Sequence, residues 1–169
     1  MIRPRVVLVG PPGAGKSTIG VALARRLGVG FRDTDADVEA ALGKPISEVF
    51  VDDGEAAFRA AERSAVTTAL DEHDGVLALG GGAVVDPATR EQLRGHRVVF
   101  LDVSLSAAVS RVGLARDRPL LLGSPRAQLK ALMDARHPWY TDVATFTVDT
   151  SSSEPADVVE AILVGLETS

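Results

Sequence analysis

The chain has 169 residues, of which 46% are hydrophobic and 24% charged, with a formal net charge of −5 and no cysteine. This length suits one filled core, so we expect a single domain over residues 1–169, and the missing cysteines exclude disulfides, thiolate metal sites and cysteine nucleophiles. The acidic balance with dispersed arginines argues against a nucleic-acid partner, which needs a basic face, and the apolar runs are too short for a membrane helix of ~20 residues.

The beginning of the chain leads directly into a nucleotide-binding motif. Residues 1–5 leave no room for a signal peptide, so we expect a cytoplasmic protein. After a strand expected over residues 5–9, residues 10–17 read Gly-Pro-Pro-Gly-Ala-Gly-Lys-Ser and fit the pattern G-x-x-x-x-G-K-[ST]. A helix expected over residues 18–27 completes the strand, loop and helix that this motif requires.

Each residue type in this loop has a physical task. The glycines let backbone N–H groups surround phosphate oxygens, and the following helix directs the positive end of its dipole to the same place. Lys16 would reach the β- and γ-phosphates, and Ser17 would offer its hydroxyl to Mg²⁺. The chain has three lysines against fifteen arginines, and one lysine falls on the motif position. This placement disfavours the alternative of a glycine-rich turn that binds nothing.

Short apolar runs alternate with helical patterns along the chain, which predicts a parallel sheet covered by helices on both faces. Ligands of such sheets bind at the carboxyl ends of the strands. The expected strands are residues 5–9, 30–32, 76–79, 98–101 and 145–148. The expected helices are residues 18–27, 36–42, 55–70 and a last helix from Pro155, with a short amphipathic turn over residues 46–53.

Asp33 and Asp35 lie two residues apart at the end of the second expected strand. Their carboxylates would therefore leave the strand on one side, toward the phosphate site. Asp33 could hold the water shell of Mg²⁺, and Asp35 could accept the proton of a substrate hydroxyl. The structural alternative is that Asp35 or Asp37 caps the helix expected over residues 36–42.

Arg59 lies at helical spacing from Glu55 and Glu62. From spacing alone, the simplest interpretation is a surface ladder of ion pairs worth ~0.3–0.5 kcal/mol each. The alternative is that Arg59 contacts a ligand, and the spacing of residues within this helix does not by itself favour it.

Three successive glycines, Gly80 to Gly82, follow the third expected strand. They lose much conformational entropy on folding, which indicates a turn that needs positive φ or the close approach of another group. A ligand lying against bare backbone N–H groups would meet that need. A tight structural turn before Asp86 is the alternative.

Residues 112–124 contain Gly113, Arg116, Arg118 and Gly123. Glycines at both ends of a charged stretch indicate a lid that closes over nucleotide and excludes water. Arg116 or Arg118 could then meet the transferring phosphoryl group. An ordinary exposed loop is the alternative.

The ordered set of motifs resembles shikimate kinase over nearly the whole chain. The set comprises residues 10–17, Asp33-Thr34-Asp35, Phe58-Arg59-x-x-Glu62, Gly80-Gly81-Gly82, Arg118-Pro119-Leu120-Leu121 and Arg136-x-x-x-Tyr140. The resemblance implies phosphorylation of the 3-hydroxyl of shikimate by Mg-ATP. It also implies an α/β fold of the nucleoside-monophosphate-kinase type, with a five-stranded parallel sheet in the order 2-3-1-4-5, and we expect a monomer.

The resemblance also assigns roles to individual residues. Those implied at shikimate are Asp35, Arg59, Gly80, Gly81, Gly82 and Arg136, with the two arginines at its carboxylate. Those implied at ATP are Gly13, Ala14, Gly15, Lys16, Ser17, Thr18, Arg111 and Arg118, with Arg111 beside the adenine. Catalysis would rest on Lys16, Asp35 and Arg118, and Mg²⁺ would bind Ser17 directly and Asp33 through water.

The same resemblance divides the chain into working parts. Residues 36–62 would form the substrate-binding segment and residues 112–124 the lid. Some family members carry arginine just before the proline of the last helix, at the adenine pocket, where this chain has Ser151-Ser152-Ser153-Glu154.

Two rival functions remain. A related small-molecule kinase, such as gluconate kinase, also acts on a polyhydroxylated acid, but the Asp-Thr-Asp and triple-glycine elements favour shikimate. A nucleotide-binding module without turnover would be expected to lack Lys16, Asp35 or Arg118, and this chain has all three.

Overall fold

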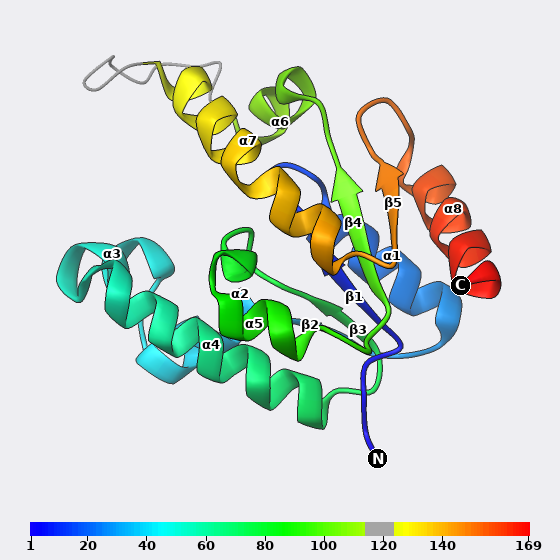
Figure 1. Ribbon diagram of the computed structural model, residues 1–169, viewed down its shortest axis with the longest axis horizontal. Helices are drawn as coiled ribbons and strands as arrows, with labels where there is room; N and C mark the ends of the chain where they lie inside the picture. The colour runs from blue at the N-terminus through cyan, green and yellow to red at the C-terminus, as the bar shows by residue number, and fades with distance from the viewer. Residues whose placement is uncertain (114–123) are drawn as a thin grey trace.

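A five-stranded parallel sheet forms the centre of the computed structural model, which describes residues 1–113 and 124–169 (Figure 1). The strand order is β2-β3-β1-β4-β5, as expected. The strands are β1 (Val6–Val9), β2 (Phe31–Asp33), β3 (Val76–Ala78), β4 (Val98–Asp102) and β5 (Phe146–Asp149). Each lies within about one residue of its expected position. Strands β1, β3 and β4 are mainly apolar or β-branched runs, whereas β2 reads Phe-Arg-Asp.

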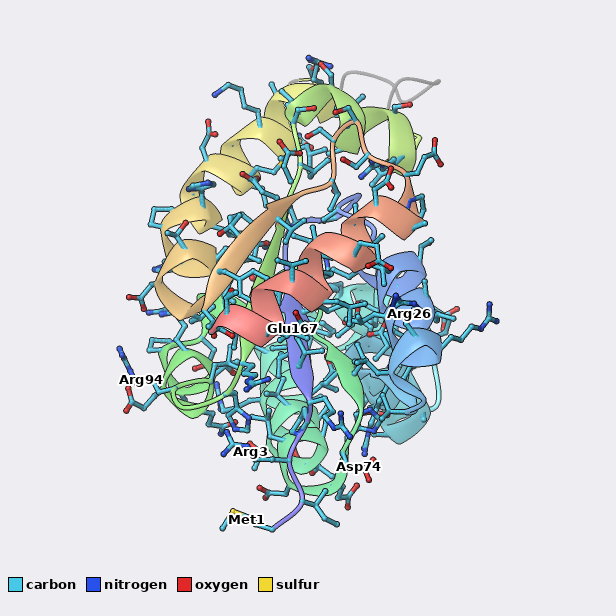
Figure 2. The ribbon with its side chains drawn as sticks, turned by 90° about the vertical axis from the view of Figure 1, so that its right-hand side faces the viewer. Met1, Arg3, Arg26, Asp74, Arg94 and Glu167 are labelled. Carbon is cyan, nitrogen blue, oxygen red and sulfur yellow. The ribbon has the colours of Figure 1, made fainter. Side chains whose placement is uncertain are left out.

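Helices cover both faces of this sheet (Figure 1). One face carries α1 (Lys16–Leu27), α6 (Leu105–Val112) and α8 (Pro155–Thr168). The other carries α4 (Gly54–Glu72), the 3₁₀ turn η1 (Ala83–Val85), α5 (Pro87–Gln92) and α7 (Pro125–Val143). Figure 2 shows α1 and α8 side by side, where Arg26 of α1 pairs with Glu160 of α8 at 2.7 Å. Among the described helices, none is long and apolar enough to cross a membrane.

The central strand β1 shows how both faces are filled. All four of its side chains are buried. They alternate between two core clusters, with Val6 and Leu8 packed toward α1 and α8 and Val7 and Val9 toward α4 and α7. Since β3 and β4 flank β1 on either side, its carboxyl end lies between two neighbouring crossovers. This is the place where open α/β sheets bind ligands.

A smaller helical unit of α2 (Thr34–Leu42), α3 (Ile46–Asp52) and the start of α4 projects beside the sheet (Figure 1). Val38, Val49 and Phe58 form its own small core. The ion pair between Lys44 Nζ and Asp53 Oδ2, at 2.7 Å, joins the two ends of α3. The segment expected to be an amphipathic turn is thus a short helix, because Val49 is buried and Ile46 packs against the same small core, while the polar residues of the segment are exposed.

Helix α2 begins two residues earlier than expected, at Thr34. The side chain of Asp33 accepts a hydrogen bond from the backbone N–H of Asp35 at 2.9 Å and caps the helix. The alternative expectation that Asp35 or Asp37 would be the cap was therefore wrong. Helix α8 does begin at Pro155, a residue well suited to the first turn because it has no N–H to leave unpaired.

Candidate active site

The loop after β1 is shaped by its glycines. Gly13 and Gly15 have φ values of 83° and 90°, in the left-handed region that glycine tolerates. A Cβ atom on Gly13 would also lie 2.9 Å from the carbonyl oxygen of Ala108, so no larger residue fits there. Gly15 precedes α1 and has no side chain to cap it, so the first N–H groups of α1 can face an anion.

Lys16 lies over this loop and beside two carboxylates. Its Nζ donates to the carbonyl oxygens of Gly10 at 2.6 Å and Pro11 at 3.1 Å. Burial lowers the pKa of Lys16 to about 8, although the charges of Asp35 and Asp33 oppose this. Bound phosphate would bring additional negative charge to the amine and favour its protonated form.

Ser17 and Asp33 place two oxygen donors at the start of α1. The Ser17 hydroxyl donates to Asp33 Oδ2 at 3.3 Å. Asp33 closes β2, whereas Asp35 lies in the first turn of α2, so the expected exit of both carboxylates from one strand was wrong. Even so, the turn at Thr34 brings Asp35 to the same place. Lys16, Ser17, Asp33 and Asp35 all line one cleft of about 460 Å³.

Asp35 lies against the backbone of the glycine segment. Burial raises the pKa of Asp35, the neighbouring Asp33 adds to this, and Lys16 opposes it. A Cβ atom on Gly80 would lie 2.4 Å from Asp35 Oδ1 and 2.9 Å from Glu62 Oε2. Glycine at this position therefore lets two carboxyl groups come close to the carboxyl end of β3. A carboxylate with a raised pKa is suited to accept a proton near neutral pH.

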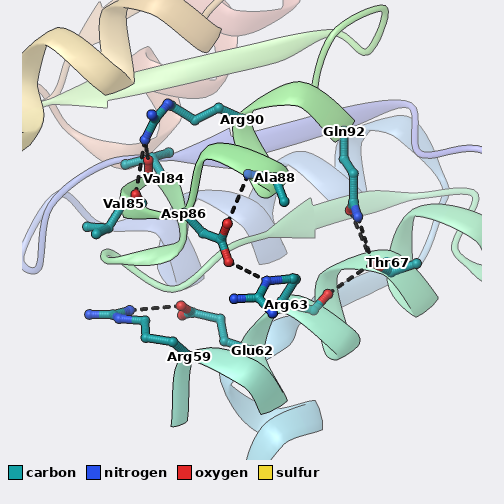
Figure 3. A network of polar contacts seen from close by, with 10 residues as sticks. All are labelled: Arg59, Glu62, Arg63, Thr67, Val84, Val85, Asp86, Ala88, Arg90 and Gln92. Atoms are coloured by element: carbon teal, nitrogen blue, oxygen red, sulfur yellow. Dashed lines mark hydrogen bonds and ion pairs between the residues drawn. The ribbon is translucent and has the colours of Figure 1, made fainter. Parts of the chain in front are cut away.

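Arg59 turns inward from α4 and is held by Glu62. The Nη1 of Arg59 is 2.8 Å from Glu62 Oε1, and the two side chains are only 17% and 4% exposed. The contact with Glu55 is longer, at 3.7 Å, and Glu55 is 70% exposed. The pair in Figure 3 is thus not the surface ladder that spacing alone suggested, because Glu62 is buried.

The three successive glycines make room for side chains of the protein itself. None of them is among the glycines with positive φ in the described chain, so close approach is the reason for their presence. A Cβ atom on Gly82 would lie 2.4 Å from Nη1 of Arg59, and one on Gly81 would lie 3.2 Å from Cδ of Pro12. The expected close approach is therefore present at all three, with carboxylates at Gly80, the phosphate loop at Gly81 and a guanidinium at Gly82.

Helix α7 brings a second arginine to this site. Arg136 and Tyr140 lie one turn apart, and the Tyr140 hydroxyl donates to the carbonyl oxygen of Gly81 at 2.6 Å. Burial raises the pKa of Glu62, and Arg59 and Arg136 both oppose this. The charges of one guanidinium from α4 and one from α7 therefore both act on the same buried carboxyl group.

A second hollow of about 430 Å³ adjoins the first and shares Gly15, Thr18 and Arg111 with it. Residues 151–155 form part of its lining. Arg111 from α6 donates to the Gly13 carbonyl oxygen at 3.1 Å and to Thr150 Oγ1 at 3.1 Å. The structure thus joins the arginine expected beside adenine to both the phosphate loop and the segment after β5.

Thr150 is a residue of this site that the sequence analysis missed. It is 2% exposed, and its hydroxyl lies 2.9 Å from the Ala14 carbonyl oxygen. No motif marks a lone threonine after a strand, so only the tertiary contact shows that it supports the loop. Arg116, Arg118 and nearly all of the lid expected over residues 112–124 lie outside the described residues.

Comparison with known proteins identifies close relatives. A family model described as shikimate kinase matches residues 12–167. A shikimate kinase from Frankia casuarinae is 60% identical over 161 residues, covering 95% of this chain and 72% of the relative. A shikimate kinase from Salinispora arenicola is 61% identical over 152 residues, covering 90% of this chain and 91% of the relative.

Solved structures agree with these relatives. Shikimate kinase from Acinetobacter baumannii in complex with shikimate has a TM-score of 0.89 and 34% identity, covering 99% of this chain and 94% of that one. A gluconokinase from Sinorhizobium meliloti has a TM-score of 0.59 and 24% identity, covering 96% of this chain and 91% of that one. The latter likeness shows only a shared fold, so it lends no support to gluconate as substrate.

Proposed function

The chain belongs to the shikimate kinase family and phosphorylates shikimate with ATP, and we propose how its residues divide that work. The observation that carries the proposal is that the charges of Arg59 and Arg136 both act on buried Glu62. The charge of Arg59 also acts on Asp35 and that of Arg136 on Lys16, and Asp35 and Lys16 line one cleft. This arrangement places a site for an acid next to a site for a polyphosphate.

Arg59 and Arg136 bind the carboxylate of shikimate. Planar guanidinium groups match the two oxygens of a carboxylate with paired N–H donors. Glu62 orients the guanidinium of Arg59 through an ion pair in which Nη1 lies 2.8 Å from Oε1. Gly80, Gly81 and Gly82 border the substrate, and the missing Cβ atoms of Gly80 and Gly82 let Asp35 and Arg59 take the positions from which they bind it. Asp35 contacts the hydroxyl groups of shikimate.

Asp35 is the general base of the transfer. The 3-hydroxyl oxygen of shikimate forms the new bond to the γ-phosphorus, its proton passes to Asp35, and the bond to the bridging oxygen breaks to leave ADP. Lys16 and Arg118 stabilise the charge on the phosphoryl group during this step. Arg118 is assigned from the family motif, since it lies outside the described residues.

The Ser17 hydroxyl and the Asp33 carboxylate provide the hard oxygen donors that suit Mg²⁺. Within the described residues, no cluster of three His, Asp or Glu side chains could hold a metal ion alone. Phosphate oxygens and water would therefore complete the coordination, with Asp33 acting through water. The ion supplies charge neutralisation at the β- and γ-phosphates when bound.

The remaining nucleotide contacts follow from the two adjoining hollows. Residues 13–18 cradle the phosphates, and Arg111 lies beside the adenine in the hollow lined by residues 151–155. We propose one domain, with residues 36–62 as its substrate-binding segment and residues 112–124 as its lid. The enzyme would act as a monomer in the cytoplasm, where ATP is available, with small molecules as its partners.

The test compares shikimate with its neutral carboxamide. Each charge-assisted contact is worth ~1.5–3 kcal/mol, so Arg136→Ala should weaken shikimate binding roughly ten- to a hundredfold or more and leave ATP binding nearly unchanged. Lys130→Ala, on the same helix but exposed and paired with Asp134, is the matched control and should change neither. If the wild-type enzyme binds the amide as well as the acid, the arginine pair does not read the carboxylate.

A further inference from the structure

We propose that Tyr140 and Arg90 are positioning residues for the arginine pair. They hold helix α7 against the segment formed by Gly81 to Val85 and so fix where Arg136 of α7 lies relative to Arg59 of α4. Neither touches a reacting atom in this proposal. The inference rests on the proposed function, because it assumes that the arginine pair binds the carboxylate.

Tyr140 supplies the first link. Its side chain is buried, stacks on Phe100 with ring centroids 5.0 Å apart, and donates its hydroxyl proton to Gly81 O at 2.6 Å. Burial raises the pKa of Tyr140 to about 12, so the hydroxyl remains a donor at any physiological pH. Gly81 precedes Gly82, which the Arg59 guanidinium approaches so closely that a Cβ atom on Gly82 would lie 2.6 Å from Nη2. One bond thus connects the helix that carries Arg136 to the backbone that supports Arg59.

Arg90 of α5 supplies the second link. Its Nη1 donates to the carbonyl oxygens of Val84 at 2.6 Å and Val85 at 3.1 Å, as Figure 3 shows. Its guanidinium carbon lies 4.9 Å from the ring centroid of Trp139, within the range of a cation–π contact. Trp139 neighbours Tyr140, so Arg90 holds η1 and α7 together at a second point.

The same segment is also bonded to α4, the helix that carries Arg59. Arg63 pairs with Asp86, and Asp86 accepts from the Ala88 N–H at 2.9 Å. Thr67 accepts from the Gln92 side-chain amide at 2.8 Å (Figure 3). Residues 81–92 therefore form a spacer with α4 bonded to one side and α7 to the other.

This spacer opposes the repulsion between the two positively charged arginines. Arg59 and Arg136 carry like charges that both act on Glu62, and Glu62 carries at most one negative charge to offset them. Their mutual repulsion favours separation of α4 and α7 when no carboxylate lies between them. Bonds that hold both helices to one spacer oppose this separation, so the substrate meets a site that is already aligned. Alignment before binding raises affinity because less order must be imposed on binding.

The test uses Tyr140→Phe and Arg90→Leu, with Arg94→Leu as the matched control. Arg94 lies four residues after Arg90, is exposed, pairs with Glu91, and is seen at the rim of the molecule in Figure 2. Tyr140→Phe keeps the ring and its packing, so it remains informative even if Arg90→Leu fails to fold. Binding of shikimate, its carboxamide and Mg-ATP is measured by titration calorimetry for each variant.

We expect shikimate binding to weaken roughly fivefold or more in both variants, the typical effect of losing one hydrogen bond, with Mg-ATP binding unchanged. The preference for acid over amide should fall as well, which general loosening of the fold would not cause. Trp139 is the only tryptophan in the chain, so its emission should shift in Arg90→Leu and not in Arg94→Leu.

Each other outcome overturns the inference. If the acid-to-amide preference stays at the wild-type value, or shikimate and Mg-ATP binding weaken together, Tyr140 and Arg90 only support the fold. If Arg136→Ala binds shikimate normally, the proposed function fails and the inference fails with it. If Arg136→Ala loses shikimate while Tyr140→Phe and Arg90→Leu keep it, only the positioning role is refuted.

Discussion

Replacing Gly82 with alanine should disable the acid-binding side of the cleft without unfolding the protein. The added Cβ would lie 2.4 Å and 2.6 Å from the two terminal nitrogens of Arg59 and 2.8 Å from its Cζ. These atoms form the end of a flexible side chain, so the guanidinium can move away at little cost to the fold. In moving, it must leave its position 2.8 Å from Glu62 Oε1 and its alignment toward the substrate.

The size of the effect follows from the contact that is lost. A hydrogen bond between charged partners contributes ~1.5–3 kcal/mol, and each 1.4 kcal/mol corresponds to a factor of ten in affinity. Gly82→Ala should therefore weaken shikimate binding roughly ten- to a hundredfold or more. Mg-ATP binding should stay close to the wild-type value, because the atoms nearest to the added Cβ all belong to Arg59 and none belongs to the phosphate loop.

Titration calorimetry with shikimate and with Mg-ATP measures both affinities. Gly30→Ala is the control, since its Cβ would meet only the Cε1 of His73, at an ordinary 3.6 Å. The change is also made on an Arg59→Ala background, where Gly82→Ala should have almost no further effect if it acts through Arg59. A full second loss of affinity on that background would refute the reasoning, as would near-normal shikimate binding by Gly82→Ala alone.

Three further predictions concern the phosphoryl transfer itself. Lys16→Met should abolish turnover in folded protein, because the amine offsets phosphate charge, and appreciable activity in well-folded mutant would contradict the loop assignment. Lys16 has a pKa of about 8 and loses its charge above it, so kcat/KM for ATP should fall as pH rises through about 8. The value of kcat at saturating ATP should fall only at higher pH, because bound phosphate favours the protonated amine. Coincident pH profiles of the two constants would contradict this prediction. Asp35→Asn should lower turnover by at least ~10²-fold with a smaller loss of shikimate binding, and a loss confined to binding would remove Asp35 as the base.

Features that depend on neighbouring residues were predictable from the sequence. The loop at residues 10–17 is recognisable because its glycines, lysine and serine act through contiguous backbone. Strands β1, β3 and β4 are recognisable because each is a mainly apolar run, whereas β2 (Phe-Arg-Asp) and β5 (Phe-Thr-Val-Asp) are recognised from their place between helical segments. The strand order came from resemblance to a family, since periodicity does not say which strands pair. The roles of Lys16, Asp35 and the two arginines remain predictions that the variants above will test.

The tertiary structure decided what spacing could not. Arg59 has the sequence spacing of a surface ladder, yet Glu62 is buried because α4 packs against the carboxyl end of β3. Asp33 rather than Asp35 caps α2, because the exit direction of the chain from β2 sets which side chain reaches the helix start. Thr150 and Tyr140 meet Ala14 and Gly81 across 136 and 59 residues of chain. Such contacts depend on how distant segments pack together, which local patterns of residues do not encode.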